Sequence, residues 1–379
     1  MASAAGVGAT LALGGCGGGG SSTSRTTATV PASPSSLLAG VEAYAHQLVG
    51  SPNPRAVGCA YAAIDGMQQV AGAAGQLSAD AAAAEPARAD SLFEIGSVTK
   101  VFTTTLLAQT IESPQQHITL TTPVGPYLPA EITNPEVKAL TFGELASYSS
   151  CLVTAAPGQN LATYTVPQLA QFLNGPNPFV SGCTPGASYF YSNLAVGLLG
   201  YTLATIWNSS WDELLRHKIT GPLQMPDTVR TPDAAQSARL ATGYGPNGPA
   251  RAIAGAPFLG SGGVLKSTAN DMLRLLAAQL DPSHAPGTLS KAISATQIKQ
   301  NGGAGRPSVG LGWFLQSTTS DQPALSKNGG TRGFGAYIAF VPAARRGAFI
   351  VTNMQHLTGG HGIRPLLGIG AAGGAADTG

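Results

Sequence analysis

The sequence predicts an α+β fold in which both ends of the chain build one antiparallel sheet, with helices inserted between them. Two observations carry this prediction. Strand-like runs occupy residues 57–75 and 310–353, close to the two ends, whereas helical patterns fill the middle of the chain. This order of strands, helices and strands indicates a sheet with flanking helices and an inserted helical subdomain.

Before this middle region, the sequence predicts a helix and a hairpin. Apolar residues recur at helical spacing from Leu37 to Leu48. Two strand-like runs, Val57 to Ile64 and Gln68 to Gly75, flank the turn Asp65-Gly66, a pattern typical of a β-hairpin. The alanine-rich stretch Ser78 to Arg88 is expected to be an exposed loop or a weak helix.

In the middle of the chain, a helix is predicted after Gly96 and another near Leu140, where Thr141 and Glu144 have the spacing of a capping box. Further helices are expected at Ser192 to Ile206, Trp211 to His217 and Asn270 to Leu280. Short strands are expected at Gly310 to Leu315, Gly335 to Val341 and Gly347 to Asn353.

The composition is that of a folded protein without a nucleic-acid partner. The 379 residues suffice for one large domain or two ordinary ones. Hydrophobic residues make up 43% and charged residues only 10%, which excludes a chain that is disordered as a whole. The formal net charge of +2 is spread without basic clusters. We expect a monomer.

Ser97 and Lys100 are the strongest catalytic candidates. They follow an apolar run that ends at Gly96, and they lie three residues apart at the start of a predicted helix, so their side chains share one face. A lysine that is partly desolvated beside a serine has a lowered pKa and can act as its base. At a helix start, the Ser97 backbone N–H can also stabilise a developing oxyanion.

Two further motifs carry groups that suit the same chemistry. Tyr191 could shuttle the serine proton to a leaving group, and Asn193 could hold a substrate amide. Lys327 could bind a carboxylate or tune the pKa of its neighbours, and the Gly330 N–H could be a second oxyanion donor. Taken alone, each motif is also compatible with a purely structural role, as an aromatic core residue with a helix cap or as a Gly-rich hairpin.

Together, Ser-x-x-Lys, Tyr-x-Asn and Lys-x-Gly, in this order, resemble the motifs of the penicillin-recognising serine hydrolases. The run Phe93 to Lys100 is similar to the nucleophile segment of one branch, the class C β-lactamases and low-mass D,D-peptidases. Stretches at 219–228, 260–272 and 310–313 resemble the same branch, and the resemblance covers roughly Leu38 to Thr352.

This resemblance implies a β-lactamase/transpeptidase-like fold and acyl transfer to a serine, with no metal or organic cofactor. The substrate would be a β-lactam or a D-Ala-D-Ala peptide of peptidoglycan. The implied catalytic residues are Ser97, Lys100 and Tyr191, and the implied substrate-binding residues are Asn193, Lys327, Asn328 and Gly330.

Departures from the family pattern keep other functions open. Asn328 stands where relatives carry a hydroxyl residue, so recognition of a substrate carboxylate can differ, and this slightly favours an esterase that acts on small acyl esters. A penicillin-binding sensor that stays acylated is a third alternative. A Ser-His-Asp hydrolase is disfavoured because the chain contains no Gly-x-Ser-x-Gly elbow.

A second departure concerns the stretch Ala146 to Leu152, in which Tyr148 replaces a histidine and Cys151 a glycine of the relatives. Cys151 and Cys183 both fall in predicted loops and could pair in an oxidising compartment. Because Cys183 precedes the turn that leads to Tyr191, a Cys151–Cys183 disulfide would staple one wall of the site. Cys59 lies in a strand-like run and is expected to be a buried thiol.

The N-terminus predicts export to the periplasm or attachment to the cell envelope by a lipid. Leu13 to Cys16 resembles the lipobox of bacterial lipoproteins, in which the cysteine carries the lipid, and this would be the chain's only membrane contact. No Lys or Arg precedes Cys16, whereas a signal peptide has a basic start, so an upstream start and a low-complexity leader both remain open.

The predicted organisation has four parts, given below in chain order, and the hydrolase domain among them is itself divided. Its sheet part covers about 37–96 and 255–372, and its helical part covers about 97–254. The parts are a signal or lipobox segment at 1–16, a flexible tether at 17–36, the hydrolase domain at 37–372 and a tail at 373–379.

Overall fold

The computed structural model describes residues 35–50, 53–155, 165–250, 260–302, 306–355, 357 and 360–370. They belong to one compact unit that spans residues 34–379. The predicted leader with Cys16, nearly all of the tether and the tail lie outside the described residues. Within the described ranges, no helix combines the length and the apolar character that a membrane span requires.

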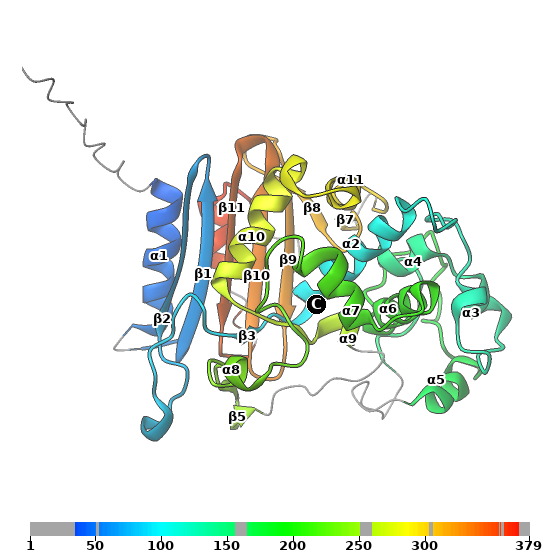
Figure 1. Cartoon of the computed structure of the whole chain (residues 1–379), viewed down its shortest axis with the longest axis horizontal. Coiled ribbons are helices and arrows are strands. Elements are labelled where there is room, and N and C mark those ends of the chain that lie inside the picture. The colour runs from blue at the N-terminus through cyan, green and yellow to red at the C-terminus, as the bar shows by residue number, and fades with distance from the viewer. Residues whose placement is uncertain are drawn as a thin grey trace, which may run out of the picture. The chain divides into compact units, whose positions relative to one another are not determined.

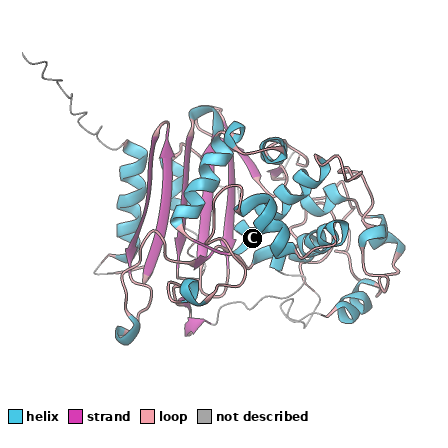
Figure 2. Cartoon of the chain, viewed as in Figure 1, coloured by secondary structure: helices cyan, strands magenta, loops and turns pink. Residues whose placement is uncertain are grey.

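The two ends of the described chain meet in a seven-stranded antiparallel sheet, as predicted (Figures 1 and 2). The strand order is β2-β1-β11-β10-β9-β8-β7, so the first strand pairs with the last, and Cys59 lies opposite Thr352. The strands are β1 (Gly58–Asp65), β2 (Gln68–Gly75), β7 (Ser308–Val309), β8 (Phe314–Ser317), β9 (Pro323–Gly330), β10 (Gly335–Val341) and β11 (Arg346–Thr352).

Helices cover both faces of this sheet, and β1 is therefore buried on both sides. Successive side chains of a strand point to opposite faces. Tyr61 packs in the cluster formed with α1 (Ser36–Val49) and α12 (Gly360–Leu366), whereas Ala60 and Ala62 belong to the main core on the other face. On that other face, α10 (Ala269–Leu280) packs against β1, β2 and β11.

The remaining helices lie beside the sheet, apart from α8 (Ala234–Ser237), and several of them pack against the buried helix α2 (Thr99–Ile111) (Figure 1). Because α2 is buried from Thr99 to Thr110, its threonine hydroxyls bond to the backbone. Thr103 Oγ1 donates to the Ser261 carbonyl at 2.6 Å, for example, and Thr99 Oγ1 accepts from the Leu265 N–H at 3.1 Å. The other helices are α3 (Pro135–Ala139), α4 (Phe142–Ala146), α5 (Val166–Leu173), α6 (Asn193–Trp207), α7 (Trp211–Leu215), α8 (Ala234–Ser237), α9 (Gly260–Gly263) and α11 (Thr288–Thr296).

Two small sheets complete the described elements. One pairs β3 (Phe93–Glu94) with β6 (Lys266–Ser267), and the other pairs β4 (Gly243–Gly245) with β5 (Gly248–Ala250). The β3–β6 pair joins the segment before Ser97 to the segment before α10, so it connects the surroundings of Ser97 to the sheet part of the fold.

Most element predictions are confirmed, including the capping box in which Thr141 and Glu144 hold the start of α4. The predicted strand Gly310 to Leu315 is wrong in its first four residues. Gly312 has a positive φ of 79°, which only glycine adopts easily, and residues 310–313 form a turn before β8. The helix predicted to reach His217 ends at Leu215 and continues as a π-helix, Arg216–Thr220.

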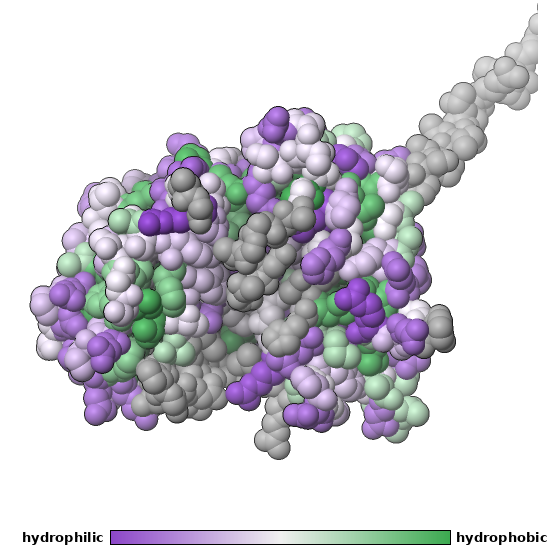
Figure 3. Space-filling model, turned by 180° about the vertical axis from the view of Figure 1, so that it is seen from behind, coloured by the Kyte–Doolittle hydropathy of each residue, from purple (hydrophilic) through white to green (hydrophobic). Residues whose placement is uncertain are grey.

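On the face drawn in Figure 3, hydrophobic residues occur in small groups among hydrophilic ones. Among the described residues, Met67 in the β1–β2 turn and Ile298 after α11 are the large hydrophobic side chains that are strongly exposed. Isolated exposed apolar residues of this kind are ordinary on a protein surface. The expectation of a monomer stays a prediction.

Candidate active site

Ser97 sits in a tight turn between the sheet and the central helix. It is part of a 3₁₀ turn, Gly96–Val98, that connects β3 to α2. Gly96 has a positive φ of 51°, and a Cβ atom added there would lie 2.5 Å from the Gly330 backbone nitrogen of β9. The absence of a side chain at Gly96 therefore lets the backbone of β9 approach this turn closely. Because Ser97 is the predicted nucleophile, the turn Gly96–Val98 is called the nucleophile turn below.

Lys100 lies one helical turn after Ser97 and is fully buried. Its Nζ is 2.9 Å from Ser97 Oγ, 2.6 Å from Asn193 Oδ1 and 2.5 Å from the Gly262 carbonyl oxygen. Burial lowers the pKa of Lys100 well below its usual value, and the nearby charge of Lys327 lowers it further. A neutral amine at hydrogen-bond distance from the serine hydroxyl can accept its proton.

Tyr191 places its ring beside both lysines of the site. Lys100 Nζ lies 4.8 Å from the ring centroid and Lys327 Nζ lies 5.1 Å from it. Burial raises the pKa of Tyr191, and the nearby Ser97 hydroxyl offsets part of the rise. The phenol is therefore protonated at neutral pH. Its buried oxygen has no hydrogen-bond partner of good geometry in the described structure.

Asn193 is the first residue of α6, directly after Ser192, whose hydroxyl accepts a hydrogen bond from the Ala195 N–H and caps the helix. The cap fixes the start of α6 so that the side-chain oxygen Oδ1 of Asn193 faces Lys100. The helix cap of the structural interpretation is present at Ser192, whereas the binding of a substrate amide by Asn193 stays a prediction.

Lys327 and Asn328 lie on β9, an eight-residue strand that the sequence analysis did not predict as such. Lys327 is fully buried, and burial lowers its pKa to about 7. Its Nζ donates to the Asn328 backbone carbonyl at 2.8 Å and to Asn328 Oδ1 at 3.0 Å. The residue after the lysine thus supplies two acceptors for its ammonium group.

The glycines that follow on β9 line the nucleophile turn. A Cβ atom added to Gly329 would lie 2.0 Å from the Ile95 carbonyl oxygen and 3.1 Å from the Ser97 nitrogen. Gly330 follows next to Gly96. The backbone N–H groups of Ser97 and Gly330, the two predicted oxyanion donors, therefore belong to adjacent backbone segments.

Sequence reasoning assigned no role to Gly262, whose carbonyl oxygen accepts a hydrogen bond from Lys100. Gly262 lies in α9, a short helix that packs against α2 and α6. Every residue has a backbone carbonyl, so residue identity does not indicate which carbonyl accepts a hydrogen bond. The glycine-rich run from 260 to 263 was a recognisable motif, but nothing in it indicates which carbonyl meets the lysine.

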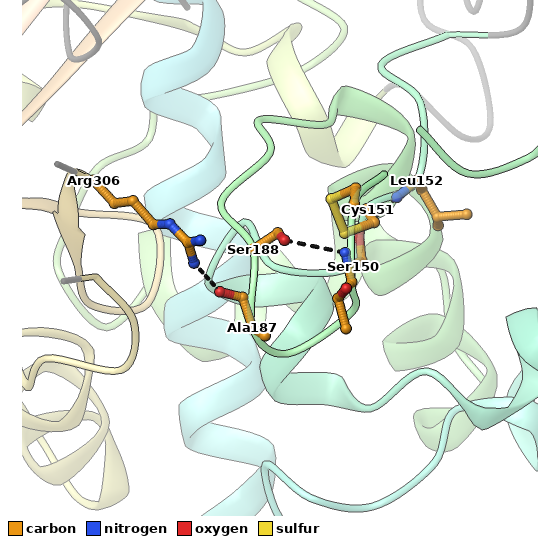
Figure 4. The surroundings of a disulfide bond; sticks show 8 residues. Ser150, Cys151, Leu152, Ala187, Ser188 and Arg306 are labelled. Atoms are coloured by element: carbon orange, nitrogen blue, oxygen red, sulfur yellow. Dashed lines mark hydrogen bonds between the residues drawn. A yellow bond between two sulfur atoms is a disulfide. The ribbon is translucent and has the colours of Figure 1, made fainter. Parts of the chain in front are cut away.

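A disulfide joins Cys151 and Cys183, whose Cα atoms lie 5.7 Å apart. Figure 4 shows it beside the turn at 184–188, where the Thr184 N–H donates to Ser188 Oγ at 3.0 Å and Arg306 donates to the Ala187 carbonyl. Cys151 has a positive φ of 60°, a conformation that suits glycine. Cys59 is buried and unpaired, as predicted, and burial raises its pKa to about 12.

In the described part of the chain, no three His, Cys, Asp or Glu side chains are grouped so that they could hold a metal ion. The groups brought together around Ser97 are two lysines, a tyrosine, two asparagines and backbone atoms of four glycines. This set suits proton transfer and oxyanion stabilisation.

Comparisons with known proteins agree with this fold. The family model described as Beta-lactamase matches residues 41–371. The D-alanyl-D-alanine-carboxypeptidase/endopeptidase AmpH of Escherichia coli is 30% identical over 284 residues, which cover 71% of this chain and 72% of AmpH. A beta-lactamase of Yersinia enterocolitica is 28% identical over 312 residues, which cover 73% of this chain and 78% of that protein.

A solved class C beta-lactamase has a similar structure, with a TM-score of 0.74 at 22% sequence identity, covering 84% of this chain and 91% of that one. This likeness supports the β-lactamase/transpeptidase-like fold that the sequence motifs implied. From the family match and the relatives, the chain belongs to the beta-lactamase family and is a serine hydrolase of that family.

Proposed function

We propose that this enzyme hydrolyses β-lactams or D-Ala-D-Ala peptides through an acyl-enzyme formed on Ser97. The observation that carries the proposal is the pair formed by Ser97 Oγ and the buried, pKa-lowered Lys100 at 2.9 Å. The names of the relatives, a carboxypeptidase/endopeptidase and β-lactamases, support the substrate class.

In the proposed acylation, Lys100 Nζ takes the Ser97 proton while Oγ attacks the substrate carbonyl carbon. The tetrahedral oxyanion is stabilised by the N–H groups of Ser97 and Gly330. The phenol of Tyr191, kept protonated by its raised pKa, donates a proton to the leaving nitrogen as the C–N bond breaks. A proton from Lys100 restores the phenol, and water then hydrolyses the ester bond to Ser97.

Asn193 and Lys327 are the proposed substrate-binding side chains. The side-chain oxygen of Asn193, Oδ1, faces Lys100. The side-chain NH₂ of Asn193 is then left to bind the acyl-side amide of a substrate. With a pKa of about 7, Lys327 is partly charged at neutral pH. A substrate carboxylate next to it would raise that pKa and so bind the charged form.

An esterase is the second candidate, and one observation favours it. The Lys327 ammonium group already meets the Asn328 carbonyl and amide oxygens at 2.8 and 3.0 Å. These acceptors compete with a substrate carboxylate. An ester substrate does not need that carboxylate, so the site suits small esters as well.

We also propose export to the periplasm or the outer surface of the membrane. The Cys151–Cys183 disulfide supports this, because disulfides persist in oxidising compartments. The lipobox-like segment that ends at Cys16 supports lipid attachment. Globomycin treatment of expressing cells tests the attachment, since it blocks lipoprotein processing and should leave an unprocessed precursor.

The function is tested with three reagents on the purified chain: a chromogenic cephalosporin, a fluorescent penicillin and a p-nitrophenyl ester. Fast release of colour from the cephalosporin supports β-lactam hydrolysis, and stoichiometric labelling by the penicillin without turnover supports a D,D-peptidase or a sensor. Ester cleavage with neither of these supports the esterase.

The matched pair of variants for this test is Ser97→Ala and Ser290→Ala. Ser97→Ala should abolish turnover and covalent labelling, because no other group forms the acyl bond. Ser290→Ala, on the surface helix α11, should behave like the wild type. Mass spectrometry should place the label on Ser97, and a label on another residue would contradict the proposal.

A further inference from the structure

The ring of Tyr191 is held by its neighbours rather than by its hydroxyl group. The buried phenol oxygen makes no hydrogen bond of good geometry with any described residue. Its ring packs on Tyr148 instead, with centroids 4.9 Å apart and ring planes tilted by 43°. In the proposed reaction this hydroxyl must point at the leaving nitrogen, so whatever fixes the ring also fixes the proton donor.

Tyr148 is itself firmly anchored. It is fully buried, and its hydroxyl donates to the Gly312 carbonyl at 2.9 Å. Its ring also contacts Phe314 of β8, with centroids 5.9 Å apart. Tyr148 has a positive φ of 56°, a conformation that costs energy for a bulky residue and persists only where the surroundings impose it.

The turn that anchors Tyr148 also contacts the helix that carries Lys100. Thr104 Oγ1 of α2 donates to the Leu311 carbonyl at 2.9 Å, and the Gly312 N–H donates to the Ala146 carbonyl at 3.2 Å. The turn therefore holds α2 and the Tyr148 segment in one arrangement. Tyr148 is the side chain that extends this arrangement to the ring of Tyr191.

The backbone around Tyr148 is bonded to the backbone around Tyr191. The Phe190 N–H donates to the Tyr148 carbonyl at 2.8 Å, and the Gly186 N–H donates to the Ser149 carbonyl at 2.9 Å. The Cys151–Cys183 disulfide is a covalent link between the same two segments (Figure 4). The two segments are 32 residues apart at the cysteines.

We propose that Tyr148 is a positioning residue for Tyr191. The Cys151–Cys183 disulfide keeps the segments around these two tyrosines in the relative position in which the Tyr148 ring packs on the Tyr191 ring. Tyr148 does not touch the reacting atoms in this proposal. Tyr148 acts through the Tyr191 ring, and the inference rests on the proposed function of Tyr191 as proton donor. Displacing a proton donor by about 1 Å can slow a reaction by roughly a hundredfold.

The test measures the acylation rate of the full chain with a fluorescent penicillin, whose leaving nitrogen needs a proton, together with the unfolding temperature. Tyr148→Leu removes the aromatic surface and should slow acylation by about ten- to a hundredfold. Tyr148→Phe keeps the ring and should retain the rate to within about threefold. Tyr127→Leu is the control, because Tyr127 also packs on an aromatic ring, Phe142, with centroids 5.6 Å apart.

A double variant separates positioning from a general loss of stability. In a Tyr191→Phe background the proton donor is already gone, so Tyr148→Leu should slow acylation by less than about twofold. If Tyr148→Leu slows the reaction equally in both backgrounds, or not at all while folded, the inference is wrong.

The disulfide is tested by Cys151→Gly combined with Cys183→Ser, since glycine suits the positive φ at residue 151. Acylation should slow by a factor of about three to ten, again only when Tyr191 is present. This variant carries the test alone if Tyr148→Leu does not fold. A wild-type chain that neither hydrolyses β-lactams nor is labelled at Ser97 would refute the proposed function, whereas variants that all match the rate of an active or labelled wild type would refute only the inference.

Discussion

The two walls of the site around Ser97 are built in different ways. On the sheet side, the nucleophile turn and β9 meet backbone to backbone, and an added Cβ atom at Gly329 would lie 2.0 Å from the Ile95 carbonyl oxygen. On the helical side, Tyr191 is held by the Tyr148 ring at 4.9 Å and by segments that a disulfide links.

The difference indicates what each wall tolerates. Backbone contacts across glycines leave no room for any side chain, because interiors are close-packed and a main-chain atom cannot rotate away. Aromatic packing permits conservative exchange, since a ring of similar size restores most of the contact. We therefore expect changes on the sheet side to affect folding and changes on the helical side to affect mainly the rate.

The largest expected effect comes from Gly329→Ala, which should break the sheet-side wall. The new Cβ atom would overlap the Ile95 carbonyl oxygen and lie 3.1 Å from the Ser97 nitrogen. We expect a loss of more than about 4 kcal/mol in unfolding free energy, or no folded protein. Urea unfolding followed by circular dichroism measures this.

Gly330→Ala is the matched control on the next residue. A Cβ atom there meets nothing within 4 Å, so the variant should fold with a stability within about 1 kcal/mol of the wild type. Equal destabilisation by both substitutions would show that the close approach at Gly329 is not what holds this wall.

A smaller effect concerns Asp271, which lies outside both walls at the start of α10. Burial raises its pKa to about 6, and hydrogen bonds from Thr228 Oγ1 and the Asp227 N–H offset part of the rise. The folded state then binds more protons than the unfolded state between about pH 4 and pH 6. Stability should fall by on the order of 2 kcal/mol as the pH rises through this window.

Asp271→Asn should remove this fall in stability with rising pH, whereas Asp281→Asn should not. The pKa of Asp281 is lowered, mainly by a hydrogen bond from the Ser283 hydroxyl. Asp281 therefore contributes stability that is lost as the pH falls, which is the opposite sign. Thermal unfolding of the two variants between pH 4 and pH 7 distinguishes them, and unchanged pH dependence in Asp271→Asn would contradict the assignment.

The smallest effect sharpens the link between the two lysines. Lys327 lowers the pKa of Lys100, although less than burial does. Lys327→Met should raise that pKa, so the rising limb of the acylation rate should move to higher pH. An uncharged p-nitrophenyl ester is the suitable substrate, because it does not depend on carboxylate binding. A rising limb that stays in place would rule out this coupling.

Local signals accounted for much of the fold. The period-2 hairpin around Asp65-Gly66 and the capping box at Thr141 each combine a short-range pattern with a specific hydrogen bond, so residue identity suffices to locate them. The catalytic candidates Ser97 and Lys100 were found in the same way, because side chains three residues apart at a helix start lie on one face and can meet.

Features that depend on distant segments were missed or misplaced. The strand β9 ends in Lys327-Asn328-Gly329-Gly330, a composition that reads as a turn, and its strand conformation comes from pairing with β8 and β10. Gly310 to Trp313 reads as part of a strand, but its backbone turns to meet α2 at Thr104. The anchoring role of Tyr148 likewise depends on Gly312, which lies 164 residues away.

The pairing of the first strand with the last has a consequence for biosynthesis. The β1–β2 hairpin can form as soon as it is made, yet the other edge of β1 stays open until β11 has left the ribosome; the Gly58 N–H bonds to Asn353, 295 residues later. Contacts of such sequence separation form slowly. An open edge strand also invites aggregation. The nascent chain therefore remains prone to aggregation, and its site around Ser97 remains incomplete, until almost its whole length has been synthesised.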